Sequence, residues 1–321
     1  MKNLVAAACA AVSMLLPGVG GAQGFPTKPV LMIVPFPPGG VADLVARAVG
    51  GEMARELKQP VVVENRAGAG GNLGAEAVAR AVPDGHTVLY AVGSILTANP
   101  YLYPKLGFDA LKDFAPITET VAGGMVLVAH PSVPVSSLRD LLAYAKANPG
   151  KLSYASYGSG SFPHLNMELL KSITGVHLLH IPYRGAAPAL SDVLAGQVEV
   201  MFDVSTTAIP QIRSGKLKAL AVNMPRRLAT LPEVPTIGEL LPGFDGSGWQ
   251  GLFVPAATPA PAVRALHAAA VKALAQPDVR KRLTDSGLDV VGGSAGDLAA
   301  KIQRESVKWA QVVKFAGIRV D

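Results

Sequence analysis

The sequence predicts an α/β protein of two lobes, the second inserted into the first, in which mostly parallel sheets are flanked by helices. Three observations support this. Short apolar runs rich in β-branched residues alternate with segments of helical periodicity over most of the 321 residues, which is typical of strands joined by crossover helices. The length corresponds to about two domains. A segment rich in Pro and Gly at 225–262 interrupts the alternation before helices resume.

The first lobe opens with an apolar run at 30–36 that predicts a strand. The following helix ends at Pro60 and is indicated by apolar residues four positions apart, namely Val45, Val49, Met53 and Leu57. We expect a second strand at 61–63, a glycine-rich turn at 68–71, a helix at 73–82 and a third strand at 88–92.

The second lobe repeats this pattern. Ser137 and Asp140 have the spacing of a capping box and open a helix that ends at Asn148. The other expected helices lie at 163–174, 186–194 and 206–214, and the strands at 125–129, 152–155, 176–182, 198–202 and 217–222. A strand at 251–254 and helices at 261–275 and from 296 close the chain. We therefore assign 23–123 and 246–321 to the first lobe and 124–245 to the second.

The N-terminus has the layout of a secretory signal peptide. Lys2 precedes an apolar run at 4–16, and small residues at 20 and 22 favour cleavage after Ala22. We therefore expect residues 1–22 to be a signal peptide and the mature protein to lie in the periplasm. Cleavage would also remove Cys9, the only cysteine, and leave neither a disulfide nor a thiol nucleophile.

Composition disfavours disorder and nucleic-acid binding. Half of the residues are hydrophobic and only 16% are charged, which is unlike a disordered chain. The net charge of +6 is scattered, and its densest clusters are Arg226–Arg227 and Arg280–Lys281–Arg282. A nucleic-acid interface would combine a basic stripe with interleaved aromatic residues, so we expect no nucleic-acid partner.

The motifs that resemble catalytic or metal sites are incomplete. Residues 292–296 read G-x-S-x-G, but the triad of that fold needs a later histidine and the last one is His267. Ser294 and Asp297 instead have the spacing of a helix cap. His177 and His180 are three apart on an expected strand and so point to opposite faces. We expect no catalytic residue, no metal and no cofactor.

The loops after the expected strands are the best candidates for a binding site. Ligands of parallel sheets gather at the carboxyl ends of strands. The loops there are rich in Gly, Ser and Ala and open helices, whose N-termini attract carboxylates. Gly39 and Gly40 are expected to let the backbone pass close to a ligand, so that a side chain at either position would intrude or strain the turn. For Asp203 we weigh two roles: accepting hydrogen bonds from bridging waters or a ligand donor, and capping the next helix.

A set of short motifs runs through the whole mature chain. They are VPFPPGG at 34–40 with Asp43, VVVENR at 61–66, GGN at 70–72, PDG at 83–85, KDF at 112–114, NPGKL at 148–152, IPYRGAAPAL at 181–190, MFD at 201–203 and LPEVPT at 231–236. Together they resemble the receptors of tripartite tricarboxylate transporters, the Bug-type solute-binding proteins. One position departs from the family pattern P-P-G-G-x-T-D, because Ala42 stands where a hydroxyl residue is common.

This resemblance implies a type 2-like periplasmic-binding-protein fold, a flytrap whose lobes close on a small carboxylate held by main-chain amides and bridging waters. The implied partners are a small organic acid and the membrane subunits of the transporter, and we expect a monomer. An exported hydrolase-like enzyme and a ligand sensor for a signalling partner are the alternatives. The expected ligand-binding residues are Phe36, Pro38, Gly39, Gly40, Val41, Ala42, Asp43, Asn72, Gly93, Ser94, Tyr157, Gly158, Ser161, His164, Arg184, Gly185, Ala186, Ala187 and Asp203.

The complete signal layout leads to a prediction about the mature N-terminus. Because export removes the signal peptide, protein isolated from its native host should begin near Gln23. Mass spectrometry of that protein should find no peptide from residues 1–22. An intact N-terminus in the cytosolic fraction would contradict the prediction.

Overall fold

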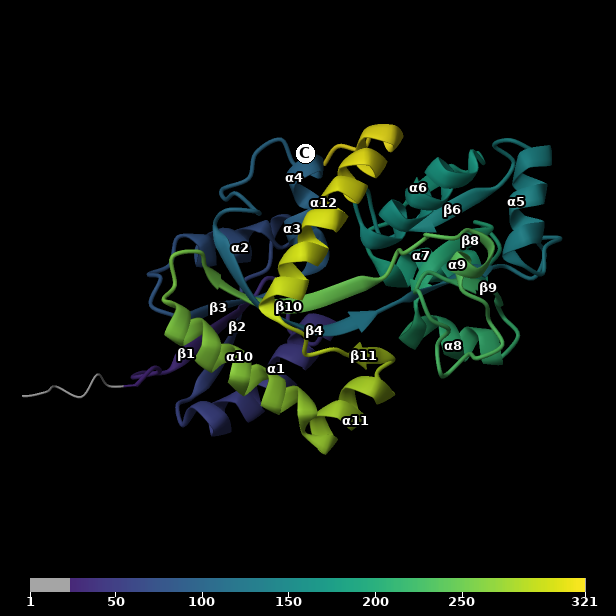
Figure 1. Ribbon diagram of the computed structural model, residues 1–321. Coiled ribbons are helices and arrows are strands. Elements are labelled where there is room, and N and C mark those ends of the chain that lie inside the picture. The colour runs from purple at the N-terminus through teal and green to yellow at the C-terminus, as the bar shows by residue number, and fades with distance from the viewer. Residues whose placement is uncertain (1–23, 321) are drawn as a thin grey trace, which may run out of the picture.

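The computed structural model describes residues 24–320, which form two sheets covered by helices (Figure 1). The expected signal peptide, residues 1–22, lies outside the described residues. No helix within 24–320 combines the length and the apolar character that crossing a membrane requires.

The first sheet has six strands in the order β11-β4-β10-β3-β1-β2. β1 pairs in parallel with β2 and β3, whereas β10 runs antiparallel to β3 and β4, and β11 antiparallel to β4. The strands are β1 Val30–Val34, β2 Val61–Asn65, β3 Thr87–Val92, β4 Phe114–Gly123, β10 Gly248–Pro255 and β11 Leu288–Val290. The helical segments that alternate with them are α1 Val41–Leu57, η1 Ala69–Gly71, α2 Asn72–Ala79, α3 Gly93–Thr97, α4 Asn99–Leu102, α10 Ala260–Ala275 and α11 Pro277–Asp285.

The second sheet has five strands in the order β7-β6-β8-β5-β9. β6 is parallel to β7 and β8, and β5 is antiparallel to β8 and β9. The strands are β5 Met125–Ala129, β6 Ser153–Ser156, β7 Leu179–Pro182, β8 Val200–Val204 and β9 Lys218–Val222. The helices are α5 Leu138–Ala147, α6 Phe162–Thr174, α7 Ala186–Leu194, α8 Ser205–Arg213 and, in the connection back to the first sheet, α9 Ile237–Leu240.

The chain passes between the sheets twice, and Asn223 joins the two passages. β4 leads into β5 through Gly123 and Gly124, and the return follows β9. The side chain of Asn223, which is fully buried, accepts from the Met125 N–H at 2.7 Å. Its amide group donates to Gly246 O at 2.6 Å and to Asn166 Oδ1 at 2.9 Å. One side chain therefore fastens both passages to α6.

The last helix, α12 (Ala295–Ala316), lies across the junction of the sheets (Figure 1). Near its start, Leu298 and Ile302 belong to a hydrophobic cluster of the first sheet. Near its end, Trp309 and Val313 belong to the cluster built on the second sheet. α12 is thus part of both hydrophobic cores, although the sequence division places 246–321 wholly in one lobe.

The predicted fold class is confirmed, but the sheets are mixed rather than mostly parallel. The reason is the inserted topology: β5 enters one sheet and β10 the other from the opposite sheet, and each runs antiparallel to both of its neighbours. The prediction also missed β4. Pro116 and Glu119 interrupt its apolar pattern, and its pairing with β10 shifts register twice, with Thr120 and Ile117 as the extra residues of β4.

The buried bonds of Asn223 lead to a prediction about stability. Asn223→Ala would leave the Met125 N–H and the Gly246 carbonyl without these partners, and we expect the free energy of unfolding to fall by about 2–4 kcal/mol. Denaturant unfolding measures the change. Asn148→Ala is a suitable control because Asn148 makes only a bond to Tyr144 O at the end of α5, and its loss should be clearly smaller. Equal losses for the two variants would contradict the role of Asn223.

Candidate functional site

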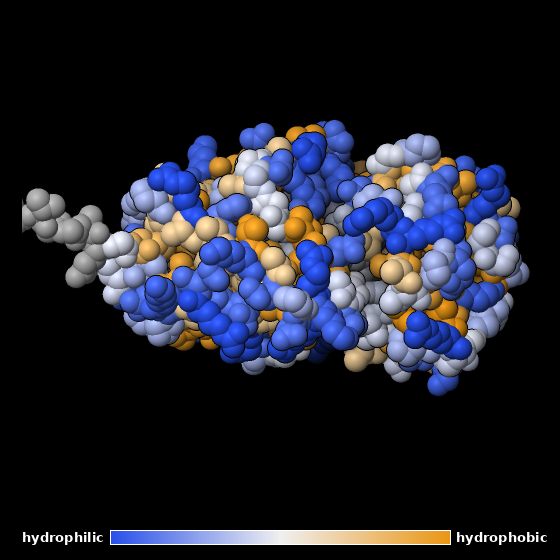
Figure 2. Space-filling model, turned by 60° about the horizontal axis from the view of Figure 1, so that its bottom comes forward, coloured by the Kyte–Doolittle hydropathy of each residue, from blue (hydrophilic) through white to orange (hydrophobic). Residues whose placement is uncertain are grey.

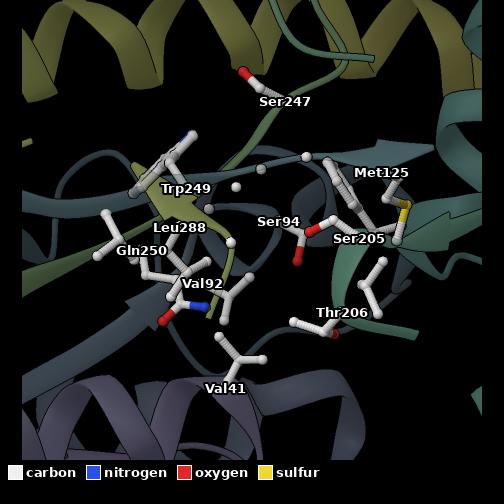
Figure 3. A pocket seen from close by; sticks show the side chains of 18 of the residues that line it. Val41, Val92, Ser94, Met125, Ser205, Thr206, Ser247, Trp249, Gln250 and Leu288 are labelled. Atoms are coloured by element: carbon white, nitrogen blue, oxygen red, sulfur yellow. The ribbon is translucent and has the colours of Figure 1, made fainter. Parts of the chain in front are cut away.

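A cavity of about 280 Å³ lies between the two sheets. The space-filling view shows a recess between the two halves of the molecule (Figure 2). The close view shows α1 and α12 on opposite sides of the cavity, with residues of both sheets between them (Figure 3). The walls include Gly123 and Gly124, where the chain first passes between the sheets.

Most of the cavity wall is apolar. Both tryptophans of the chain, Trp249 and Trp309, line it. The other hydrophobic lining residues come from both sheets and their helices: Val41, Val92, Val121, Met125, Tyr157, Phe162, Leu165, Val204 and Leu288. Such a wall favours a ligand with an apolar portion.

Four helices begin at the cavity. Val41 is the first residue of α1, Gly93 of α3, Phe162 of α6 and Ser205 of α8, and all four line the cavity. No side chain caps the first turn of any of these four helices. By contrast, Ser137, Thr236 and Ser294 cap α5, α9 and α12. Uncapped first-turn N–H groups leave donors that can bind an anion.

Three hydroxyl groups add to these donors. Ser94, Ser205 and Thr206 line the cavity, and within residues 24–320 no hydrogen-bond partner of their side chains is found. Ser205 is only 4% exposed, and the cavity is the space that it lines. Figure 3 shows Ser94 and Ser205 near the middle of the cavity and Thr206 nearer to α1. An oxygen-bearing ligand would supply the missing partners.

Glu305 is the one charged residue among the described residues that line the cavity. Its Oε2 accepts from Trp249 Nε1 at 2.8 Å, and the side chain is largely buried. Burial raises the pKa of this carboxyl group, although Lys308, with Nζ 3.9 Å from Oε1, opposes the shift. No lysine or arginine of the described chain lines the cavity, so donors to an anion there are neutral groups.

Of the first loop, only Val41 lines the cavity. Asp43 instead accepts from the Gly39 N–H, Arg47 and Asn65, and Asn65 also donates to Phe36 O. The bond from Arg47 is the largest cause that lowers the pKa of Asp43 to about 2. The contacts of Asp43 therefore fix the shape of the loop behind the cavity.

Three further residues of this loop lie outside the cavity lining. Ala42, in the first turn of α1, is buried in the core of the first sheet and does not line the cavity, although it was expected to bind the ligand. Phe36 packs against two of the hydrophobic clusters, and Pro38 is exposed. The two glycines also differ from the expectation: Gly39 has φ +86°, whereas Gly40 is extended and a Cβ there meets only Pro37 O at 3.8 Å. A side chain would therefore strain the backbone at Gly39 but not at Gly40.

Of the residues expected from the other loops of the first sheet, some line the cavity and one lies outside it. Gly93 and Ser94 line the cavity. Asn72 does not, because its Oδ1 accepts from Asn99 Nδ2 at 2.6 Å and both side chains are buried. Asn99 also donates to Gly70 O, so this pair fixes the glycine-rich turn.

Tyr157 lines the cavity and Asp203 holds it in place. The Tyr157 hydroxyl donates to Asp203 Oδ1, and the Thr207 hydroxyl donates to Oδ2 at 2.6 Å. Asp203 is fully buried and absent from the lining, so its oxygens are occupied by protein donors rather than directed at a ligand. It is not the N-cap of α8 either, since Val204 occupies that position. Its contacts position Tyr157 and the first turn of α8.

The remaining expected residues shape two loops beside the cavity. Ser161 Oγ donates to Gly158 O, and His164 Nδ1 accepts from the Gly160 N–H at 3.0 Å. His164 stacks on His180 with 3.8 Å between ring centroids. Burial, assisted by His180, lowers the pKa of His164 to about 3, so it is neutral at pH 7. Four residues at the start of α7 lie outside the lining, and Arg184 among them is exposed: Arg184, Gly185, Ala186 and Ala187.

The sequence prediction missed the wall formed by β10, α12 and the loop at 286–288. Trp249, Glu305 and Trp309 carry no motif, because a tryptophan or glutamate on a helix or strand is ordinarily read as core or surface. Glu305 and Trp309 follow Trp249 by 56 and 60 residues in the sequence, and only the fold brings the three side chains together at the cavity. The cap predicted at Ser294 does form, with Ser294 accepting from the Asp297 N–H.

Comparison with known proteins gives a consistent result. The family model described as tripartite tricarboxylate transporter family receptor matches residues 45–318. Protein BugT of Bordetella pertussis is 36% identical over 301 residues, covering 93% of this chain and 92% of BugT.

Two solved structures carry bound acids. MatC from Rhodopseudomonas palustris, with bound malate, is 39% identical at a TM-score of 0.75, covering 90% of this chain and 100% of MatC. Another R. palustris protein, with adipate, is 32% identical at a TM-score of 0.78, covering 92% of this chain and 100% of that one.

The burial of Asp203 leads to a prediction about pH. Burial raises its pKa, so the folded state disfavours the ionised form. The stability associated with the protonated form is therefore lost as pH rises through the folded-state pKa. Asp203→Asn cannot ionise. It keeps an oxygen that accepts from the Tyr157 hydroxyl and places an amide group beside the Thr207 hydroxyl. We expect the unfolding free energies of the two proteins to be similar near pH 4 and to diverge in favour of the variant toward pH 7.

Denaturant unfolding across this pH range measures the difference. Asp203→Ala, which removes both contacts, serves as the comparison and should be less stable than the natural protein throughout. The prediction would be contradicted if the stability of Asp203→Asn, measured relative to the natural protein, fell between pH 4 and pH 7.

Proposed function

The chain belongs to the tripartite tricarboxylate transporter receptor family, as its motifs indicated, and we propose that it binds a small carboxylate in the cavity between its two sheets and delivers it to a membrane transporter of that type. The family consists of solute-binding receptors rather than enzymes. We further propose that this chain acts in the periplasm, after removal of residues 1–22.

The observation that carries the proposal is the convergence of uncapped helix N-termini on one cavity. α1, α6 and α8 each direct first-turn N–H groups to it, and the buried Ser205 hydroxyl adds a donor without a protein partner. Such groups stabilise an anion with fixed dipoles, without a lysine or arginine. The ligands in the R. palustris relatives, malate and adipate, are carboxylates, which supports the same chemical class here.

The topology also supports a closing motion. We propose that 23–123 with 246–321 and 124–245 move as two bodies, connected through Gly123–Gly124 and the segment after β9. A ligand between them would contact the starts of α1 and α3 on one side and of α6 and α8 on the other, so that binding would favour the closed arrangement. Within the cavity, the proposed contacts from the sequence analysis are Val41, Gly93, Ser94 and Tyr157.

A binding experiment tests the proposal. A thermal-shift screen over mono-, di- and tricarboxylates and aromatic acids should find stabilising ligands. Because both tryptophans line the cavity, quenching of their fluorescence can then be titrated for each hit. No stabilisation and no fluorescence change with any carboxylate would contradict the proposed function.

The role of Ser205 gives a sharper prediction. Ser205→Ala removes the buried hydroxyl and should raise the dissociation constant of a carboxylate hit about 10-fold or more, as expected for loss of a hydrogen bond to a charged group. Ser191→Ala on the exposed face of α7 is the matched control and should bind as the natural protein does. Unchanged affinity in Ser205→Ala would place the carboxylate elsewhere in the cavity.

A further inference from the structure

One amide group in the cavity wall has donors without a partner. Gln250 lines the cavity from β10. Its Oε1 accepts from the Tyr90 hydroxyl at 2.8 Å, whereas its Nε2 donates to no acceptor within residues 24–320. The cross-strand neighbours of Gln250, Val92 and Val121, are apolar and line the cavity as well. An acceptor for the N–H groups of Nε2 therefore has to come from the cavity.

On the premise of the proposed function, we propose that Gln250 contacts the ligand, with Nε2 donating to a carboxylate oxygen, and that Tyr90 is the positioning residue that holds the amide in this orientation. Gln250 belongs to the first sheet, and Ser205 begins the helix that follows β8 of the second sheet. A ligand held by both side chains would link the two sheets.

An irregularity of the first sheet brings two hydroxyl groups to Gln250. Thr120 is the extra residue of β4 where the pairing with β10 shifts register after Gln250. The Thr120 hydroxyl donates to Gln250 O at 3.0 Å, and its oxygen lies 3.0 Å from the Tyr90 hydroxyl oxygen. Bulges of this kind redirect side chains and are frequent beside functional sites. Both the backbone and the side-chain oxygen of Gln250 are therefore held from the sheet.

Tyr90 keeps the proton that this arrangement requires. Its side chain is fully buried, and burial raises the pKa of its hydroxyl, so Tyr90 is protonated at neutral pH and donates to Gln250 Oε1. Figure 3 shows the nitrogen of the Gln250 amide directed toward Val92 and Val41 and its oxygen directed away from them. The Tyr90 bond thus uses the acceptor of the amide and leaves the donor for the cavity.

The position of Gln250 in the strand also points to a ligand. Alternate residues of a strand share a face, and the next two residues on this face of β10, Leu252 and Val254, belong to a hydrophobic cluster of the first sheet. An amide at the end of an apolar row costs free energy unless its polar atoms are bonded. Tyr90 satisfies the oxygen only, and a ligand carboxylate would satisfy the nitrogen.

Two substitutions at Gln250 test the contact and its direction. The probe is the acid that binds most tightly among L-malate, adipate and benzoate, or the best hit of the carboxylate screen if none of these binds. Gln250→Met removes the donor at similar side-chain length and should raise the dissociation constant about 10-fold or more, as for loss of a hydrogen bond to a charged group. Gln250→Glu keeps an oxygen that accepts from the Tyr90 hydroxyl but presents a negative charge to the ligand. At pH 8 it should raise the dissociation constant about 100-fold or more.

The matched control for the charge is Gln303→Glu. Gln303 lies on the exposed side of α12, and this variant should bind the probe as the natural protein does. Isothermal titration calorimetry and tryptophan fluorescence measure the affinities.

A double-mutant cycle tests the positioning role of Tyr90. Tyr90→Phe frees the amide to turn and should weaken binding about 3- to 10-fold. Added to Gln250→Met it should weaken binding by less than about 2-fold, because no amide remains to be positioned. Equal effects in the two backgrounds would overturn the positioning role. Tyr101→Phe, which loses a hydroxyl bonded to Ser306 outside the cavity, is the control and should leave the affinity unchanged.

Nuclear magnetic resonance tests the contact in the natural protein, independently of how any variant folds. The side-chain amide signals of Gln250 should shift when the probe saturates the cavity, because its N–H groups gain a charged acceptor. Those of Gln303 should stay in place.

The outcomes separate this inference from the proposed function. If Gln250→Glu binds the probe as tightly as the natural protein or more tightly, the amide accepts from a ligand donor instead, which overturns the inference and leaves the receptor function intact. Binding detected by tryptophan fluorescence without a shift of the Gln250 amide signals would overturn it as well. If no carboxylate of the screen binds the natural protein, the proposed function fails and the inference fails with it.

Discussion

The structure depends above all on the buried amide of Asn223, because this side chain joins the two passages of the chain between the sheets. Its bonds to Met125, Gly246 and Asn166 link the start of β5, the approach to β10 and α6. The space around it is tight: a side chain at Gly124 would collide with Met224, and one at Gly246 with Asn166. Because β5 and β10 are set there, the relative placement of the walls that enclose the cavity is set there too.

α12 adds a second constraint and gives the cavity its chemical character. The helix packs into the cores of both sheets and so closes the cavity opposite α1. The helix starts at the cavity supply partial positive charge from the backbone, which needs no counter-ion in the folded protein. Glu305 supplies the only side-chain charge of the described lining.

Several polar residues that resemble ligand contacts in the sequence hold loops instead. Asp43 fixes the turn before α1, Asp203 fixes Tyr157 and the first turn of α8, and His164 fixes the loop before α6. Each is buried and each uses its oxygens or ring nitrogen on protein donors. Since a buried polar atom needs a partner, such residues are required wherever an irregular loop must hold one shape beside a ligand.

By itself the sequence determined the fold class, the family, most strands and helices, and the set of helix starts that approach the site, since these follow from local periodicity, turn residues and short motifs. It indicated Val41, Gly93, Ser94 and Tyr157, which line the cavity, because each lies at or beside a loop after a strand. Only the tertiary structure decided that Asp203 faces Tyr157, that β5 and β10 run antiparallel to their neighbours, and that Trp249, Glu305 and Trp309 form one wall. The physical reason is that side-chain contacts between distant segments depend on how two sheets and α12 pack, and no local pattern records that packing.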